Sequence, residues 1–345
     1  MSKSILAALI GSAFAIGPVH AGLMIDLNGA LGGGVINADA LDWAPTSFLA
    51  KGGNTAIAAF AGSGGACVSV AGVNPCSFDV LTHAKLNGYL PVLGAGFVGL
   101  PAFGGEITIV ARYTETVTFF GVIGGLPIAT FASTGAGWVE FYFSAANSDN
   151  LTGNGFNDGR LIGRLMGVDV GKVGSFLVTS LTAIPLDATG DGNQYPGQMT
   201  VSGFGSQATL TAGTGGVDLD PTFFLTAFTD FSMNYTNISI GLPFTTVNPS
   251  DCFNPAMAGG AVGTSGLLST CDAVHVMGPY AVQANPTGYT PVVGLVNGIS
   301  FTSPDFVAQT DFNSAVTGTV PEPGSLALVG FALGALGFAA RRRRV

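Results

Sequence analysis

Hydrophobic and polar residues alternate along much of the chain with a period of two, which is typical of β-strands. The clearest case is EITIVARYTETVTFF, residues 106–120, where one face carries Ile107, Ile109, Ala111, Tyr113, Val117 and Phe119. The other face carries Thr108, Arg112, Thr114, Thr116 and Thr118. WVEFYFS, residues 138–144, repeats the pattern with Val139, Phe141 and Phe143 set against Trp138, Glu140 and Tyr142. Both segments are predicted strands with one buried face.

Other predicted strands cover 173–181, 198–203, 207–212, 223–235 and 298–303, and glycine-rich turns such as Gly124-Gly125 separate them. Helical periodicity is nearly absent. The best short exception is residues 48–62, where the Gly52-Gly53 pair argues against a continuous helix. Many strands, frequent turns and no strand–helix alternation predict an all-β fold, an antiparallel β-sandwich of jelly-roll-like form.

The first 21 residues read as a secretory signal peptide. Lys3 precedes an apolar stretch from Ile5 to Ile16, and small residues at Val19-His20-Ala21 suit cleavage by signal peptidase between Ala21 and Gly22. The apolar stretch is short for a membrane-spanning helix. We therefore expect an exported chain whose extracellular body spans residues 22–319.

The segment 320–345 combines three features in a fixed order. Pro321, Glu322 and Pro323 come first, residues 325–340 carry no charge, and Arg341, Arg342, Arg343 and Arg344 follow. Sixteen helical residues reach about 24 Å, close to the thickness of a bilayer's hydrocarbon core, so 325–340 is a predicted transmembrane helix. The arginines would lie on the cytoplasmic side of the inner membrane by the positive-inside rule.

Charge is scarce in this protein. Only 9% of residues are charged, the net charge is −9, and five of the 11 basic residues are Lys3 and the four arginines near the C-terminus. An acidic body argues against binding to nucleic acid, which is held mainly through Lys and Arg. A surface polar through Ser, Thr, Asn and Gln suits contact with neutral polymers, although low charge also favours self-association.

The four cysteines form two pairs that are local in sequence, Cys67 with Cys76 and Cys252 with Cys271. In an exported chain this spacing predicts two disulfides. Zinc is the alternative, but neither pair has the C-x₂-C spacing of a structural zinc site, and only His83 and His275 remain after the signal peptide is removed.

No pattern in the body demands catalysis. The chain has no G-x-S-x-G stretch for a serine hydrolase. Glu106, Glu115 and Glu140 lie on or near predicted strands, so a glycosidase-like carboxylate pair is conceivable, but solvent-exposed carboxylates on a sheet are the favoured interpretation. We predict no catalytic residue and no enzyme activity.

Calcium is the one cofactor that the sequence suggests. Asp187, Asp191 and Asn193 alternate around Gly192, as in the first half of an EF-hand loop. The twelfth position is Gln198 instead of a glutamate, and no helices are predicted beside it. Turns built from Asx and Gly have the same composition, and we favour that interpretation, with no cofactor.

The Pro-Glu-Pro triplet, apolar segment and arginine cluster resemble the PEP-CTERM sorting signal. The resemblance implies export by a Gram-negative bacterium, transient anchoring in the inner membrane and recognition by exosortase. Segments of the body, namely DWAPTSFLAKGGNTAIAAF, GNGFNDGRLIG, DPTFF, GLPFTTVNPS and AQTDFNSAV, resemble the PepA family of flocculation-associated PEP-CTERM proteins, which help cells adhere within an extracellular polysaccharide matrix.

Three functions follow as hypotheses. The leading one is a non-enzymatic matrix protein that promotes flocculation or biofilm cohesion together with exopolysaccharide. The second is a carbohydrate-binding module at the cell surface, with exposed aromatic side chains such as Trp43, Trp138 or Tyr142 stacking on sugar rings. The third is a secreted hydrolase.

Overall fold

The computed structural model describes residues 22–30, 34–92, 94–145, 148, 155–157, 159–185, 199–236, 262 and 306–318. Over these residues the chain forms strands and one helix, α2 (Gly53–Gly62). The strands are β1 (Leu23–Asp26), β2 (Val35–Lys51), β3 (Ser77–Pro91), β4 (Val98–Gly99), β5 (Glu106–Ile123), β6 (Leu126–Ser144), β7 (Arg160–Val168), β8 (Val170–Pro185), β9 (Met199–Gln207), β10 (Leu210–Leu219), β11 (Phe228–Thr236) and β12 (Phe306–Gly318).

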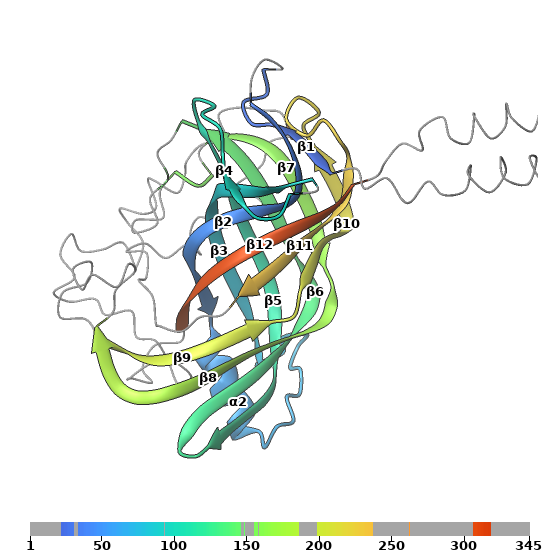
Figure 1. Ribbon diagram of the computed structural model, residues 1–345. Helices are drawn as coiled ribbons and strands as arrows, with labels where there is room; N and C mark the ends of the chain where they lie inside the picture. The colour runs from blue at the N-terminus through green and yellow to red at the C-terminus, as the bar shows by residue number, and fades with distance from the viewer. Residues whose placement is uncertain are drawn as a thin grey trace, which may run out of the picture.

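All strand pairings are antiparallel, and the sheet closes on itself (Figure 1). Hydrogen-bonded neighbours run in the order β2-β12-β11-β10-β7-β6-β5-β3, and β3 pairs again with β2. β1 and β4 extend the sheet from β2 and β3. The predicted all-β antiparallel class is confirmed. The two layers that face each other across the core are joined by continuous hydrogen bonding around the ring.

β6 changes its partner along its length. Trp138–Phe143 pair with β7, whereas Ile128–Thr134 pair with β8. β8 in turn pairs with β9. The change falls at Gly135, whose φ of 93° is rarely adopted by other residues and where an added Cβ would lie 2.8 Å from Val170 Cγ2. The ladder between β5 and β6 also shifts register here, between Tyr113 and Glu115. The β5–β6 hairpin therefore extends past the ring.

The interior of the ring is filled by aromatic side chains around Phe141. The Phe141 ring lies 5.0 Å from Phe231, 5.7 Å from Phe224 and 6.1 Å from Trp43, measured between centroids. These four side chains are buried, and the Trp43 Nε1–H donates a hydrogen bond of 2.9 Å to Ser314 Oγ on β12. The cluster thus joins strands that are distant in sequence. The predicted inward faces of 107–113 and 139–143 are confirmed.

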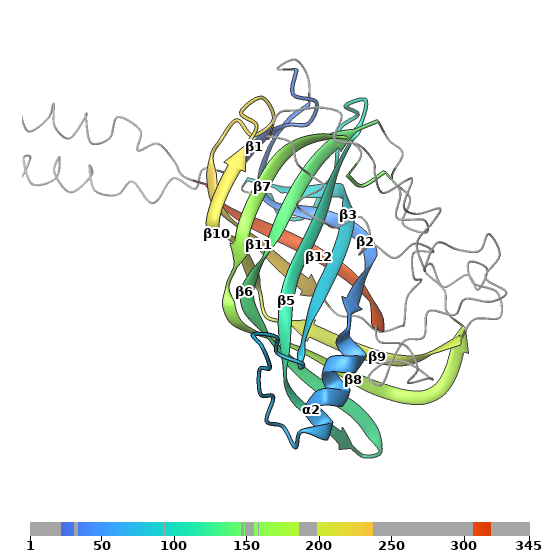
Figure 2. The same ribbon diagram turned by 180° about the vertical axis from the view of Figure 1, so that it is seen from behind.

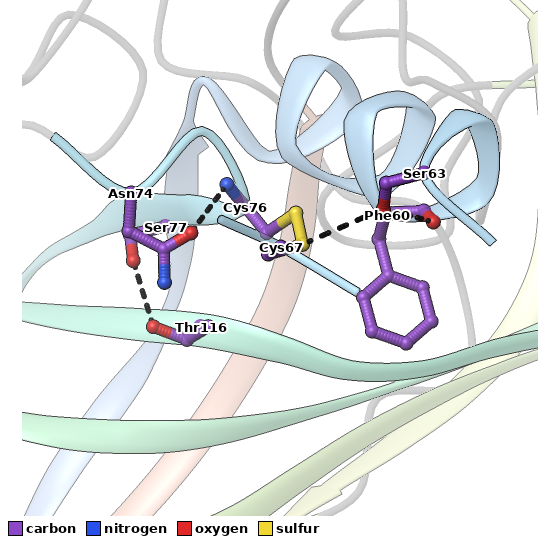
Figure 3. Close-up of a disulfide and its surroundings, with 7 residues drawn as sticks. All are labelled: Phe60, Ser63, Cys67, Asn74, Cys76, Ser77 and Thr116. Atoms are coloured by element: carbon purple, nitrogen blue, oxygen red, sulfur yellow. Dashed lines mark hydrogen bonds between the residues drawn. A yellow bond between two sulfur atoms is a disulfide. The ribbon is translucent and has the colours of Figure 1, made fainter. Parts of the chain in front are cut away.

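A disulfide closes the loop that follows α2. The turn from β2 into the helix uses Gly52 with a φ of 79°, so the glycine pair does separate strand from helix. Cys67 and Cys76 are bonded, with 6.0 Å between their Cα atoms, which confirms that predicted pair (Figure 3). The Val117 N–H donates to the Cys76 carbonyl, joining the loop to β5. Cys252 and Cys271 lie outside the described residues.

The ring has two distinct ends (Figures 1 and 2). At one end β2 runs into α2, the disulfide loop leads into β3, and the β5–β6 hairpin projects. β12 begins near this end, where Phe306 pairs with Ala50. Because β12 runs antiparallel to β2, Gly318 lies at the opposite end, near β1.

We expect Phe141→Ala to lower the free energy of unfolding by about 4 kcal/mol, because it removes the ring that contacts four other aromatic side chains and leaves a cavity. The matched control is Phe119→Ala on the adjacent strand, where the ring is exposed and the loss should stay within about 0.5 kcal/mol. Denaturant unfolding of both variants measures the difference. Equal losses would show that Phe141 is not the centre of the core.

Candidate functional site

The three glutamates that the sequence offered for catalysis are all buried, so the expectation of solvent-exposed carboxylates was wrong. The reason is that both faces of β5 and β6 are covered near Glu106 and Glu140, while Glu115 points into the ring. Glu106 accepts hydrogen bonds from the Ser148 backbone N–H at 2.7 Å and from the Ser148 hydroxyl at 2.8 Å. It ties a loop segment to the start of β5.

Glu140 is held between two side chains on the outer face of the sheet. Arg164 Nε donates to its Oε1 at 2.7 Å, and the Tyr142 hydroxyl donates to its Oε2 at 2.7 Å. Burial raises the pKa of Glu140 above its usual range, and the bonds from Tyr142 and Arg164 oppose that rise. Each carboxylate oxygen accepts a hydrogen bond, so Arg164 and Tyr142 hold the Glu140 side chain in place.

Glu115 occupies a different environment, inside the ring. Glu115 lies opposite Phe78 on β3 and opposite Ser133 on β6. Its Oε1 and the Gln207 amide oxygen both lie close to Gly174, where an added Cβ would meet the two atoms. Burial raises the pKa of Glu115 to about 8, against a smaller lowering from Gln207. Glu115 Oε1 and Gln207 Nε2 have no hydrogen-bond partner in the described structure, so burial dominates the pKa of this carboxyl.

The described glutamates do not form a glycosidase pair. Glu115 shares the inner face with Phe78, whereas Glu140 lies opposite Val110 on the outer face, so the sheet separates them. Glu106 and Glu140 share the outer face, but Glu106 is opposite Ser144, four residues along β6 from Glu140. That offset is about 14 Å at strand spacing, beyond the roughly 5–10 Å that glycosidases use.

The aromatic residues considered for stacking on sugars are buried as well, which corrects that hypothesis. Trp43 is in the central core, and Trp138 and Tyr142 are 5% and 1% exposed on the outer face. Other side chains are also buried outside the ring, where His83 stacks on Phe156 at 3.9 Å between centroids. None of the three side chains offers a flat surface to a sugar.

The calcium ligands Asp187, Asp191 and Asn193 lie outside the described residues. Within the described part of the chain, no three His, Cys, Asp or Glu side chains come together as metal ligands would. The predicted cleavage position at Ala21 and Gly22 falls at the border of the described region, and only Gly22 is described.

A surface feature that the sequence interpretation missed lies at the α2 end of the ring. Residues 52–78 and 116–139 contain no charged side chain, and they form α2, the disulfide loop and the β5–β6 hairpin (Figures 1 and 2). We call this surface the uncharged end. Large apolar side chains are exposed there, including Val70 and Val122. Two long stretches without charge were the signal in the sequence, but only the fold brings them together.

These observations define an all-β protein with a disulfide-closed loop, in which Glu106 and Glu140 accept hydrogen bonds from neighbouring side chains. Residues 319–344 match the PEP-CTERM protein-sorting motif. The matched range contains the predicted Pro321, Glu322, Pro323 and Arg341–Arg344, so this chain is an exported protein that carries an exosortase sorting signal for the envelope of a Gram-negative bacterium. No curated protein and no solved structure matches the chain.

The predicted transmembrane helix, residues 325–340, lies outside the described residues. Among the helices that the structure does describe, none has the length and apolar character needed to cross a membrane.

We expect Glu115→Gln to stabilise the protein increasingly as the pH rises from about 4.5 to 8. The pKa of Glu115 is about 8 in the folded protein against an ordinary value of 4.5, so the unfolded chain loses this proton first and stability falls across that range. The variant has no proton to lose there. Thermal unfolding at half-unit pH steps should show the two proteins converging near pH 4.5 and separating by up to a few kcal/mol near pH 8. Parallel curves would contradict the raised pKa.

Proposed function

We propose that this protein is a non-enzymatic component of the extracellular matrix that promotes flocculation or biofilm cohesion with exopolysaccharide. The observation that carries the proposal is an exosortase sorting motif on a chain with few charged residues, several of which pair with each other within the body. Signal peptidase and exosortase would process the exported chain, and its working surface would then meet other cells and polymers.

The described ion pairs support a structural role for the charges. Arg112 binds Asp79 at 2.7 Å, Arg164 binds Glu140 at 2.7 Å, and Arg160 binds Asp220. Each pair joins neighbouring strands or a strand to a turn, and each leaves little charge free for an ionic substrate. The body segments that resemble flocculation-associated PEP-CTERM proteins support the same assignment.

Burial of Trp43, Trp138 and Tyr142 disfavours the carbohydrate-binding module that would use them. Separation of Glu106, Glu115 and Glu140 disfavours the secreted glycoside hydrolase. Cohesion needs neither a stacking platform nor a catalytic pair. It needs a stable scaffold, attachment at one end and an adhesive surface.

Deleting the gene should abolish or strongly reduce floc formation by the host, because a cohesive component would be missing. Settling of the culture and light microscopy measure the change. Complementation with the wild-type chain should restore flocs. Normal flocculation of the deletion strain would refute the cohesive role.

Intact-mass measurement of the protein recovered from outside the cell should give a C-terminus close to Pro323, as expected if exosortase removes the segment that follows the Pro-Glu-Pro triplet. A host strain lacking exosortase is the control and should retain the full tail on the membrane fraction. Recovery of the intact Val345 terminus from the extracellular fraction would contradict processing at the motif.

A further inference from the structure

The uncharged end exposes six large apolar side chains in two groups. On the disulfide loop, Val68, Val70 and Val73 are 72%, 71% and 69% exposed. On the β5–β6 hairpin, Phe119, Val122 and Ile123 are 47%, 62% and 61% exposed. Single exposed apolar residues are ordinary, but a cluster at one end of a protein marks an interaction site.

The loop that carries the valines is held in shape. Val70 and Val73 pair as an isolated bridge around Ala71 and Gly72, whose φ angles of 51° and 82° are those of a tight hairpin turn. The Cys67–Cys76 disulfide closes the base of this loop, and the Val117 N–H fixes Cys76 to β5. The apolar side chains are therefore presented on a preorganised surface, which lowers the entropy cost of association.

The hairpin also presents a strand edge. Pairing between β3 and β5 ends at Ser77 and Thr116, and from residue 118 to 123 β5 has β6 as its sole ladder partner among the described strands. An edge of this kind can pair with a strand of another molecule. Proteins commonly guard such edges with charged side chains, and this edge has none.

The distribution of charge over the protein indicates which partner this surface can bind. The chain has a net charge of −9, so two copies repel each other through most of their surface. At the uncharged end they can meet without burying a charge or placing like charges together. This surface exposes hydroxyl groups such as those of Ser69 and Thr118, but its large exposed side chains are valine, isoleucine and phenylalanine, which favour an apolar partner over a neutral sugar polymer. A second copy supplies both the apolar side chains and the strand edge.

The position of the uncharged end suits contact between two copies of the protein that are attached at different places. Gly318, the residue before the matched sorting motif, lies at the opposite end of the ring (Figures 1 and 2). A protein attached through that motif directs its uncharged end away from the point of attachment. A membrane at the attachment site is thus not the surface that this end meets.

We propose that the uncharged end is a homotypic contact site, through which two copies of this protein associate by burying Val70, Val122 and their apolar neighbours against each other. The contact is two-fold and self-complementary, as in most homodimers. The inference rests on the proposed cohesive function and names its partner: the same protein displayed on another cell or elsewhere in the matrix.

The test uses the protein in the form that the host exports, purified from the extracellular fraction, and measures self-association by sedimentation velocity over a concentration series. Val70→Asp and Val122→Asp each place a charge in the contact, and across a two-fold axis like charges then face each other. We expect each to weaken dimerisation at least tenfold. Val170→Asp is the matched control, because Val170 is 74% exposed and lies on β8 beside the Asp169–Lys172 ion pair, opposite Thr134 and away from the turn of the β5–β6 hairpin.

The control should dimerise as the wild type does, and all three variants should keep the wild-type melting temperature, since each changed side chain is exposed. Reduction of the Cys67–Cys76 disulfide should also weaken the dimer, because the valine loop loses its closure. A wild-type protein that stays monomeric over the series overturns the proposal, as does equal weakening by Val170→Asp. Binding of monomers to neutral polysaccharide or to phospholipid vesicles that Val122→Asp abolishes would assign the surface to that partner instead.

Cell experiments separate this inference from the function on which it rests. If the deletion strain flocculates normally, the cohesive function fails. If that strain loses its flocs and the Val122→Asp chain restores them as fully as the wild type, the function stands and the homotypic contact fails. Restoration by Val170→Asp but not by Val70→Asp or Val122→Asp is the result that we expect.

Discussion

The second pairing of β3, to β2 as well as to β5, is the constraint on which the remaining structure depends. It converts a chain of antiparallel strands into a closed ring, and closure gives the strands an inside. The Phe141 cluster fills that inside with contacts from β2, β6, β11 and the turn before β11. Trp43 also fixes β2 relative to β12, because its indole N–H donates a hydrogen bond to Ser314 Oγ on β12. Pairing and packing thus select the same arrangement, as expected for a well-specified fold.

Closure of the ring also determines where the polar side chains lie. Each strand has one face toward the core, so the alternating polar residues lie on the outer face, where some of them, such as Thr108 and Glu140, are nevertheless buried. Glu140 is tolerated there because Arg164 and Tyr142 occupy its two oxygens. Glu115 is the exception, since it faces inward beside Phe78 and is accommodated by remaining protonated near neutral pH. Its neutral state preserves the apolar character of that end of the interior.

Sequence patterns predicted the parts of this structure that depend on local chemistry. The inward faces of 107–113 and 139–143, the break at Gly52 and the Cys67–Cys76 pair follow from residue type and near spacing. The pairing of β2 with β12 joins residues more than 250 positions apart and has no local signal. Phe119 has the same alternation as Ile109 in the sequence, but it is exposed because the β5–β6 ladder shifts register between Val117 and Phe119, so that Phe120 packs on the core instead. Burial of Glu140 and Trp138 depends on what covers the outer face, which alternation does not encode.

The separation between the sorting motif and the disulfide loop depends on one feature of the fold, the antiparallel pairing of β12 with β2. It carries the last described strand from the α2 end to the β1 end, so the sorting motif continues from the end farthest from the disulfide loop. The absence of charge from 51 residues in two separate stretches, 52–78 and 116–139, fits the proposed contact, although exposed valines also favour nonspecific aggregation. The Cys67–Cys76 disulfide holds the valine loop in shape, so adhesion would be restricted to one defined surface.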